Sequence, residues 1–271
     1  SFSGDGLLQH GEAAIERAVA QARRFVAEGA DCLDVGGMST RPGHALVDVE
    51  EELARVIPVI RALAQEVNVP ISVDTFRAKV AQAALAAGAH LLNDVWGLRF
   101  DPDLAAIAAQ AFAPLIVMDN RMQPADPAYA AAVQAAQHGP SQGDLIQDIR
   151  QQLAVALAKA EAAGLPRWLQ IVDPGIGFGK TLEQHLELIR RLDELTAWGY
   201  PLLFGPSRKS FIGKVLGDLP PEQRLEGTLS ACVMAIERGA NLLRVHDVQA
   251  IARGARFADA VLRPKAAKTE G

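Results

Sequence analysis

Short runs of apolar residues recur along this chain, and each run ends at a polar or charged side chain. An apolar run without alternation is typical of a strand that is buried on both faces, as in a parallel sheet. Such a core does not need the polar residues at the ends of the runs, so we expect them to form the rim of a site. The seven runs end at Asp34, Asp74, Asn93, Asp119, Asp173, Lys209 and the pair Arg244 and His246.

Segments with helical apolar spacing separate these runs. We expect helices over residues 12–27, 49–67, 77–87, 144–163, 182–198 and 224–238. Regular alternation of strand and helix predicts parallel strands that are joined by crossover helices. Three helix-to-strand joints repeat a glycine, at Gly29, Gly88 and Gly239, where a helix is expected to end with a left-handed residue.

The seven predicted strands indicate an α/β fold, a (β/α)8 TIM barrel whose first strand is missing or truncated before Ser1. A doubly wound sheet is the alternative, but Gly175 and Gly177 are followed by Lys180 where a dinucleotide-binding fingerprint has glycine. No Ser/Pro/Gly-rich linker divides the chain, so residues 1–271 are expected to form one domain. Residues 120–143 interrupt the periodicity and predict a long loop.

Composition argues against two classes of partner. The net charge is -5 and the longest basic cluster is Arg208-Lys209, so we expect no nucleic-acid-binding surface. No apolar run approaches the roughly 18 residues of a membrane-spanning helix, so we expect no membrane partner. Cys32, in a predicted strand, and Cys232, in a predicted helix, lack the spacing of a metal site. Buried, reduced thiols and a cytoplasmic location are therefore expected.

The loop after the first apolar run is rich in glycine and hydroxyl groups and carries one cation. Its residues 36–43 are GGMSTRPG, in which the cation is Arg41. Such a loop can approach a ligand closely, and the arginine can bind a carboxylate or a phosphate. The alternative is a solvated loop with a surface arginine.

A second glycine-rich loop follows the run that ends at Asp173. Residues 173–181, DPGIGFGKT, resemble a phosphate-binding P-loop, but Pro174 stands where the first glycine of that motif would be. We therefore reject a P-loop function. Phe178 is flanked by glycines, and we expect it to cover a flat ligand rather than to fill the core.

Cations gather after the last two predicted strands. Residues 205–213 include Arg208 and Lys209, and Arg244 and His246 follow the final strand. In barrels these two loops often bind phosphate, so the cations predict a phosphorylated or pyrophosphorylated substrate. A histidine at the end of a strand is also often a structural hydrogen-bonding residue, and this alternative stays open for His246.

Three oxygen-bearing side chains, Asp74, Asn93 and Asp173, end different strands and should converge near the barrel axis. Two carboxylates and an amide can bind the edge of a planar nitrogen heterocycle. A divalent metal is the rival ligand. Mg²⁺, however, usually keeps its waters and binds substrate phosphates, so we name no protein ligand for a metal. Ser-His-Asp hydrolysis has no G-x-S-x-G motif to support it.

Six ordered segments resemble the dihydropteroate synthase family of pterin-binding barrels. They extend over nearly the whole chain, up to about Val248. Ser1-Phe2-Ser3 also resembles the end of the family's N-terminal signature, whose preceding asparagine would contact metal and pyrophosphate. The six segments are 34–43 (DVGGMSTRPG), 72–75 (SVDT), 93–98 (NDVWGL), 173–181 (DPGIGFGKT), 207–213 (SRKSFIG) and 244–248 (RVHDV).

This resemblance implies a transferase of folate biosynthesis. In the family's reaction, p-aminobenzoate displaces pyrophosphate from 6-hydroxymethyl-7,8-dihydropterin pyrophosphate, with Mg²⁺ as cofactor, and sulfonamides mimic p-aminobenzoate. The expected partners are these small-molecule substrates. Barrels of this family tend to pair through outer helices, so a homodimer is also expected.

By position in the motifs, the resemblance assigns three groups of site residues. Asp74, Asp173 and Lys209 would be catalytic and would bind the pterin together with Asn93. Arg244 and His246 would bind the pyrophosphate. The p-aminobenzoate pocket would consist of Thr40, Arg41, Pro42, Phe178, Ser207 and Lys209.

Two positions depart from the family's pattern. Met38 stands where the family usually has Glu, and we expect it to lie in a mobile loop with little effect. Asp119 stands where the family commonly has His, and its charge either alters pterin contacts or metal affinity or simply faces solvent. Two alternative functions remain open. One is a pterin-binding methyltransferase of the methyltetrahydrofolate class, which has no use for a pyrophosphate-binding set. The other is a pterin-binding homologue without turnover.

Overall fold

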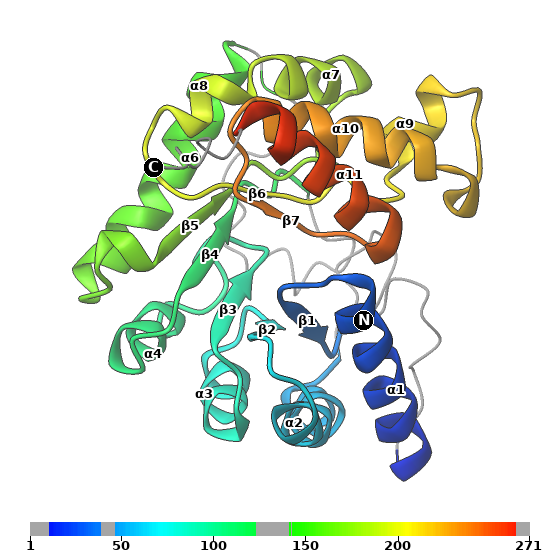
Figure 1. Ribbon diagram of the computed structural model, residues 1–271. Helices are drawn as coiled ribbons and strands as arrows, with labels where there is room; N and C mark the ends of the chain where they lie inside the picture. Colours follow the sequence, from blue (N-terminus) through cyan, green and yellow to red (C-terminus); the bar gives the residue numbers. More distant parts are fainter. Residues whose placement is uncertain (1–10, 39–46, 123–140, 142, 264–271) are drawn as a thin grey trace, which may run out of the picture.

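Parallel strands lie in chain order at the centre of the molecule, with helices around their outside (Figure 1). This computed structural model describes residues 11–38, 47–122, 141 and 143–263. All pairings between named strands are parallel. The strands are β1 (Leu33–Gly36), β2 (Ile71–Asp74), β3 (Leu91–Asp94), β4 (Leu115–Met118), β5 (Gln170–Asp173), β6 (Leu203–Phe204) and β7 (Leu242–Leu243).

Strands β1 to β5 form one sheet in that order, and β6 and β7 form a second. A parallel bridge between Val172 and Leu202 joins the two sheets. Residue pairing sets the polar ends of neighbouring strands beside each other, as shown by Asp74 opposite Asn93. Because the carboxyl ends of parallel strands share one rim, the residues expected to form a site are brought to the same end of the barrel.

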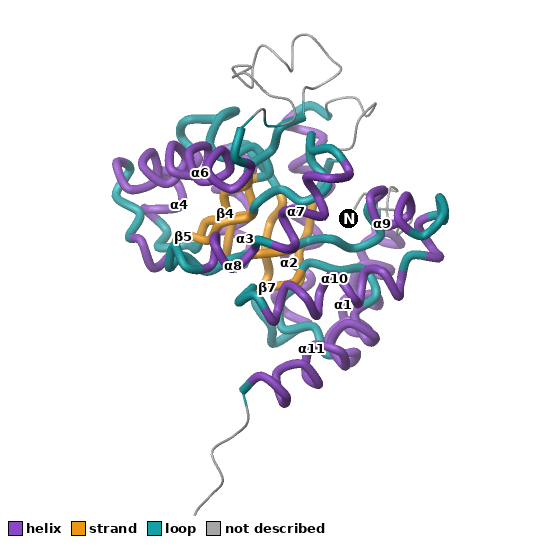
Figure 2. Tube along the Cα trace, turned by 90° about the horizontal axis from the view of Figure 1, so that it is seen from above, coloured by secondary structure: helices purple, strands orange, loops and turns teal. Residues whose placement is uncertain are grey.

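Helices cover the outside of the strands in both views (Figures 1 and 2). Most of the expected helices are confirmed within one residue at each end. Gly29, Gly88 and Gly239 follow three of them with φ angles of 105°, 113° and 91°, as their left-handed role requires. The helices that match expected segments are α1 (Glu12–Glu28), α2 (Val49–Glu66), α3 (Ala78–Ala87), α6 (Leu145–Ala162) and α10 (Leu225–Glu237).

Other helices differ from the expectation. The helix expected over 182–198 is two helices, α7 (Leu182–Arg190) and α8 (Leu192–Thr196), which meet at Arg191. The Arg191 guanidinium binds Glu187, Glu194 and Asp144, so its side chain ties the break to α6. Among the described residues, helices that we did not expect are α4 (Leu104–Gln110), α9 (Ser210–Val215) and α11 (Val248–Leu262). Short 3₁₀ turns cover Arg167–Leu169 and Pro221–Gln223.

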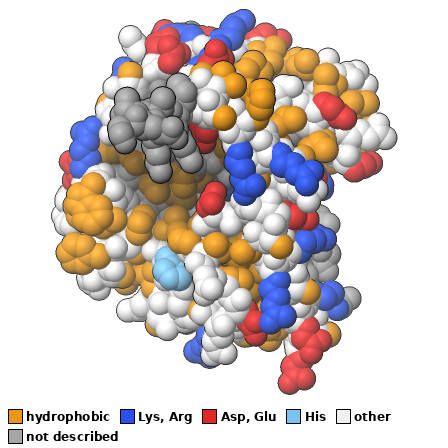
Figure 3. Space-filling view, viewed as in Figure 1, with side chains coloured by type: hydrophobic (Ala, Val, Ile, Leu, Met, Phe, Trp, Pro, Cys, Tyr) orange, Lys and Arg blue, Asp and Glu red, His pale blue; other side chains and the backbone are white. Residues whose placement is uncertain are grey.

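Apolar side chains from several strands form a layer inside the barrel. One layer of buried inward-facing residues consists of Leu91, Ile116, Ile171 and Leu203, with Leu242 against it. A larger apolar core lies between the strands and the helices and includes Ile71, Val73 and Leu92. On the face seen in Figure 1, hydrophobic side chains gather around a central hollow (Figure 3). The polar residues at the carboxyl ends of the strands, such as Asp74 and Asp173, place the candidate site there.

The barrel has one open seam. Within the described residues β7 and β1 are not paired, and a cavity of about 490 Å³ lies between them, with α1 and α11 on its outer side. Seven strands in barrel order agree with the expected (β/α)8 architecture. The eighth strand, expected before Ser1, stays a prediction.

The two cysteines differ from each other. Cys232 is buried in α10, as expected. The expectation of a buried strand residue is wrong for Cys32, which precedes β1 and is exposed. Its position beside the seam cavity explains this exposure. Every helix in the described parts of the chain is too short or too polar to cross a membrane.

Candidate active site

An arginine joins the two ends of the strand series. Arg244, just after β7, donates through Nε to Asp34 Oδ2 at 2.7 Å and through Nη2 to Asp74 Oδ2 at 2.9 Å. Asp34 lies in β1 and Asp74 ends β2, so these contacts cross the seam where the strands are not paired. One predicted pyrophosphate ligand and one predicted pterin ligand are therefore in direct contact.

The seam cavity contains predicted residues from several strands. The cavity extends along the seam from Gly29 and Asp31, before β1, to Ser207 and His246 at the carboxyl ends of the strands. Asp74 is hydrogen-bonded to Arg244, which lines the cavity. Asp173 ends β5 on the same rim. The predicted site residues that line the cavity are Asn93, Ser207, Lys209, Arg244 and His246.

Two further pairs of predicted residues meet. The Lys209 ammonium lies 4.4 Å from the centre of the Phe178 ring, and it donates a hydrogen bond to the carbonyl of Ile176. The Ser207 hydroxyl lies 2.9 Å from His246 Nδ1 and accepts from the His246 backbone N–H at 3.1 Å. Residues predicted to bind p-aminobenzoate thus lie beside residues predicted to bind pterin and pyrophosphate. Thr40, Arg41 and Pro42 lie outside the described residues.

Burial raises the pKa of the acids at this rim. For Asp74 the pKa is raised to about 7, because desolvation outweighs the Arg244 charge and because Asp34 and Glu52 add negative charge nearby. Desolvation also raises the pKa of Asp173, against the attraction of Lys209 and the hydrogen bond from Gly175. Burial thus favours the protonated form of both carboxyl groups relative to an exposed acid.

Glycines let the loop after β5 pass close to other backbone. Gly175 has φ 67°, and a Cβ there would lie 1.9 Å from the carbonyl oxygen of Asp119. Gly177 has φ 84°, and a Cβ there would lie 2.3 Å from the Lys209 side chain. Only glycine fits these positions without moving the neighbouring groups. The glycine pattern in 173–181 therefore reflects close packing around Asp173 and Lys209.

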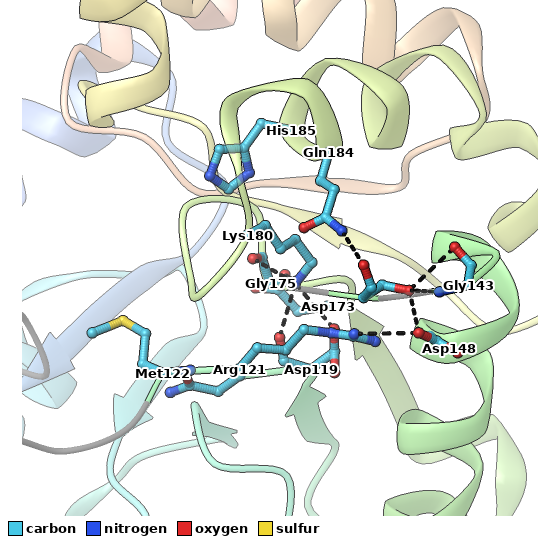
Figure 4. A network of polar contacts seen from close by, with 12 residues as sticks. Asp119, Arg121, Met122, Gly143, Asp148, Asp173, Gly175, Lys180, Gln184 and His185 are labelled. Carbon is cyan, nitrogen blue, oxygen red and sulfur yellow. Dashed lines mark hydrogen bonds and ion pairs between the residues drawn. The ribbon is translucent and has the colours of Figure 1, made fainter. Parts of the chain in front are cut away.

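A buried ion-pair network lies directly beneath this loop (Figure 4). The Asp119 carboxylate accepts from Lys180 Nζ at 3.0 Å and from Arg121 Nε at 2.8 Å. All three side chains are buried. Of the alternatives for Asp119, exposure to solvent is wrong, because two cations cover its charge. The sequence showed Lys180 in the loop motif but gave no signal for its partner, 61 residues away.

A second buried network was also missed. Glu52 in α2 accepts from the Thr75 hydroxyl at 2.7 Å and from the Arg77 guanidinium at 2.5 Å. Arg77 also donates to the carbonyl of Asp48. This network fixes the chain just after Asp74. An acid at the start of α2 looks like an ordinary helix-end residue in the sequence, so only the fold identifies it as part of the site's support.

Met38, expected to lie in a mobile loop with little effect, is partly buried. It packs against a buried apolar cluster of Phe76, Val95, Trp96 and Met118, together with Phe178. Methionine is well suited to fill an irregular apolar space of this kind. The residue therefore contributes to the apolar support of the rim.

The donor set gives little support for a metal held by the protein alone. In the described parts of the chain, no group of three or more His, Cys, Asp or Glu side chains is placed to bind a metal ion. The Asp34 and Asp74 carboxylates are both bound to Arg244. The described residues thus do not form a closed Mg²⁺ site.

Comparisons with known proteins agree with this geometry. Residues 2–246 match the family described as pterin binding enzyme. The dihydropteroate synthase of Synechocystis sp. is 46% identical over 263 residues, which cover 97% of this chain and 86% of that protein. The chain belongs to the dihydropteroate synthases. It is accordingly a transferase of folate biosynthesis.

Solved dihydropteroate synthases share the fold. The Clostridium difficile enzyme, in the presence of pteroic acid, has a TM-score of 0.85 and 42% identity, covering 93% of this chain and 90% of that one. The Xanthomonas albilineans enzyme in complex with 7,8-dihydropteroate has a TM-score of 0.80 and 39% identity, covering 92% of this chain and 88% of that one. The barrel fold expected from the strand and helix pattern is confirmed by these similarities.

Proposed function

We propose that the acids and cations at the carboxyl ends of the strands carry out the dihydropteroate synthase reaction. The chain condenses 6-hydroxymethyl-7,8-dihydropterin pyrophosphate with p-aminobenzoate and releases 7,8-dihydropteroate and pyrophosphate. The observation that carries the site assignment is the bridge from Arg244 to Asp34 and Asp74. This bridge places Arg244, the proposed cation for the anionic leaving group, in contact with Asp74, a proposed acid for the pterin ring.

Asp74, Asn93, Asp173 and Lys209 are the proposed pterin ligands. The pterin edge carries N–H donors, which a carboxylate accepts better than a carboxylic acid does. Asp74 and Asn93 lie opposite each other on β2 and β3. Their oxygens therefore start from neighbouring rigid strands, which favours a preformed pterin site.

Arg244 and His246 are the proposed pyrophosphate ligands. As the bond from the exocyclic methylene to the pyrophosphate oxygen breaks, the electron pair leaves with the anion, and nearby cations favour that charge. The electron-rich pterin stabilises the cation that forms at the methylene, and the Asp74 and Asp173 carboxylates favour it as well. The amine of p-aminobenzoate then forms the new C–N bond and loses a proton. No covalent nucleophile of the protein is required.

The proposed p-aminobenzoate pocket is formed by Phe178, Ser207 and Lys209, together with Thr40, Arg41 and Pro42 of the loop outside the described residues. The Phe178 ring can cover the flat face of the aromatic substrate. Its contact with Lys209 is supporting evidence, because it joins this pocket to the pterin site.

Mg²⁺ is proposed to arrive with the substrate. Its preferred ligands are oxygens, and it commonly keeps its waters and binds phosphate groups rather than a protein cage. That preference fits a chain whose described residues offer no closed donor set. When bound, the ion would neutralise charge on the pyrophosphate. The cytoplasmic location and the absence of nucleic-acid partners stay predictions.

A homodimer is also proposed, through the outer surface of α10 and α11. Large apolar side chains are exposed on these two helices, and Phe257 is 73% exposed. Such a gathering of exposed apolar groups is typical of a protein contact surface. The side chains concerned are Val233, Met234, Phe257, Val261 and Leu262.

The reaction is tested by measuring 7,8-dihydropteroate formation from the two substrates, with each one omitted in turn. We expect product only when both are present, and pyrophosphate in equal amount. Pterin binding without product would instead support the silent homologue. Methyl transfer to or from a folate would support the methyltransferase alternative. The variant Asp173→Asn, which lacks a proposed pterin ligand, is the inactive control and should form little product.

A further inference from the structure

Lys180 has every one of its N–H groups satisfied in the interior. Its side chain has an exposed fraction of 0%. The ammonium donates to Asp119 Oδ2 at 3.0 Å, to the Asp119 carbonyl at 3.3 Å and to the Gly175 carbonyl at 3.1 Å. Three acceptors match the three donors of a lysine. The lysine therefore connects the end of β4 to the turn that follows β5.

That turn carries Asp173, a proposed pterin ligand. The Gly175 N–H donates to Asp173 Oδ1 at 2.7 Å, and the Asp119 N–H donates to the Asp173 carbonyl at 3.0 Å. Lys180 thus holds residues on both sides of Asp173 at once: the neighbouring strand end at Asp119 and the turn at Gly175. One oxygen of the Asp173 carboxylate is fixed by this turn, and the orientation of the carboxylate is fixed with it.

A buried ion pair is a weak source of stability, because removing both charges from water offsets most of their attraction. Desolvation lowers the pKa of Lys180, and the charge and hydrogen bond of Asp119 oppose this, followed by the charge of Asp173. An apolar pair of similar volume would often be as stable. The contact with Gly175 therefore points to a role in orienting the turn rather than in holding the fold.

We propose that Lys180 and Asp119 are positioning residues for the Asp173 carboxylate in pterin binding. This inference rests on the proposed function, since it takes Asp173 to be a pterin ligand. Asp119 provides the charge that keeps Lys180 protonated in the interior, and Arg121 shares that carboxylate. Lys180 then holds the turn through Gly175. Neither side chain needs to touch the substrate.

The test compares pterin affinity with stability in matched variants. The affinity for 6-hydroxymethylpterin is measured by calorimetry, and the free energy of unfolding by urea. Asp119→Asn leaves Lys180 buried with a neutral partner, so it is expected to lose stability. The double variant Asp119→Asn/Lys180→Met removes the buried charge and is expected to recover that stability. In the double variant, however, the turn still lacks the hydrogen bond that the Lys180 ammonium donates to the Gly175 carbonyl.

We expect Lys180→Met and the double variant both to bind the pterin about tenfold more weakly than the parent chain. A merely structural role predicts instead that affinity recovers with stability in the double variant. Leu153→Ala is the control, because it removes buried apolar contacts in α6 and loses stability without touching the turn. Its pterin affinity is expected to stay within about twofold of the parent.

Asp173→Asn separates the two ways in which the proposal can fail. If Asp173→Asn loses pterin affinity while Lys180→Met and the double variant stay within about twofold of the parent, the positioning role is wrong and the site assignment survives. If Asp173→Asn itself binds the pterin normally, the assignment of Asp173 is wrong and the positioning role falls with it. Should Lys180→Met fail to fold, the double variant alone decides.

Discussion

The Arg244 guanidinium lies 2.6 Å from the Asp34 carboxylate and so joins the ends of β7 and β1. The same group lies 2.9 Å from Asp74. The proposed pyrophosphate cation is thus paired with Asp34 and with Asp74, a proposed pterin ligand. Arg244 and Asp74 are partners of each other, so a ligand that binds one of them changes the pairing of the other. Binding of pyrophosphate and binding of pterin should therefore be coupled.

Arg244→Ala should weaken pyrophosphate binding and slow the reaction. The lost charge should remove about 2 to 4 kcal/mol of transition-state stabilisation, as for other donors to a developing anion. Pyrophosphate affinity and kcat/KM are the measurements. Lys79→Ala, which removes an exposed surface cation on α3, is the control and should behave like the parent. Normal pyrophosphate affinity together with normal catalysis in Arg244→Ala would make the residue purely structural.

Asp74→Asn should weaken pterin binding even without Mg²⁺. The reason is that Asp74 is proposed to accept from the pterin ring itself rather than to hold a metal. Calorimetric titration of 6-hydroxymethylpterin in the presence of a chelator measures this directly. We expect a loss of about tenfold, since hydrogen bonds to a charged partner contribute about 1.5 to 3 kcal/mol. Unchanged metal-free affinity would reject the assignment.

Pterin affinity should rise with pH up to about 7. Burial raises the pKa of Asp74 to about 7 in the ligand-free chain, so the acid is largely protonated below that pH. The N–H donors of the pterin favour the carboxylate, and binding therefore releases a proton. Affinity should increase by up to about tenfold per pH unit between pH 5.5 and 7 and then level off.

The variant Asp74→Asn is the control for this pH dependence. It cannot ionise, so the slope should shrink to the part that Asp173 contributes. Arg244, Asp34 and Glu52 are the charged groups around Asp74, and each is kept in the variant. A parent affinity that is flat between pH 5.5 and 7 would show that Asp74 is already ionised before the pterin binds.

The strand ends could be predicted because burial on both faces leaves a clear apolar signal. Asp74 and Asn93, for example, end apolar runs, and the structure sets them opposite each other. The residues that orient them could not be predicted. Glu52 and Lys180 look like ordinary residues at helix starts, and their partners lie far away in the chain. A single sequence carries no periodic signal for a contact that only the closed fold creates.

Helix boundaries show the same limit. The 182–198 segment keeps helical apolar spacing across Arg191, so the pattern predicts one helix. At the break the Arg191 guanidinium binds Glu187 and also Asp144, 47 residues away, a tertiary contact that the apolar pattern does not predict. Cys32 was misplaced for a related reason. Its apolar neighbours predict burial, but the open seam beside β1 exposes it.

Phe257→Asp should convert the proposed homodimer to a monomer. Phe257 is 73% exposed on α11, and a carboxylate within an apolar contact would be buried without a partner. Sedimentation velocity measures the oligomeric state. Phe112→Asp, which changes an exposed aromatic outside α10 and α11, is the matched control and should leave the dimer intact. A parent chain that sediments as a monomer at high concentration would reject the dimer itself.

The last prediction concerns the order in which the substrates bind. In the ligand-free chain the Lys209 ammonium lies over the Phe178 ring and donates to the Ile176 carbonyl. The cation proposed for both substrates is therefore in contact with the loop after β5. The pterin ligands lie on strand ends, whereas Phe178 lies between glycines, so the pterin site should be preformed and the aminobenzoate site assembled later.

We therefore expect p-aminobenzoate, and sulfonamides that mimic it, to bind measurably only after pterin and pyrophosphate are present. Calorimetric titration of p-aminobenzoate into the ligand-free chain should give no saturable heat, whereas the same titration with both ligands present should. The variant Phe178→Ala should lose the second signal while it keeps pterin affinity, because the ring covers only the later site. Tight binding of p-aminobenzoate with an empty pterin site would overturn the ordered scheme, since p-aminobenzoate would then bind before the pterin.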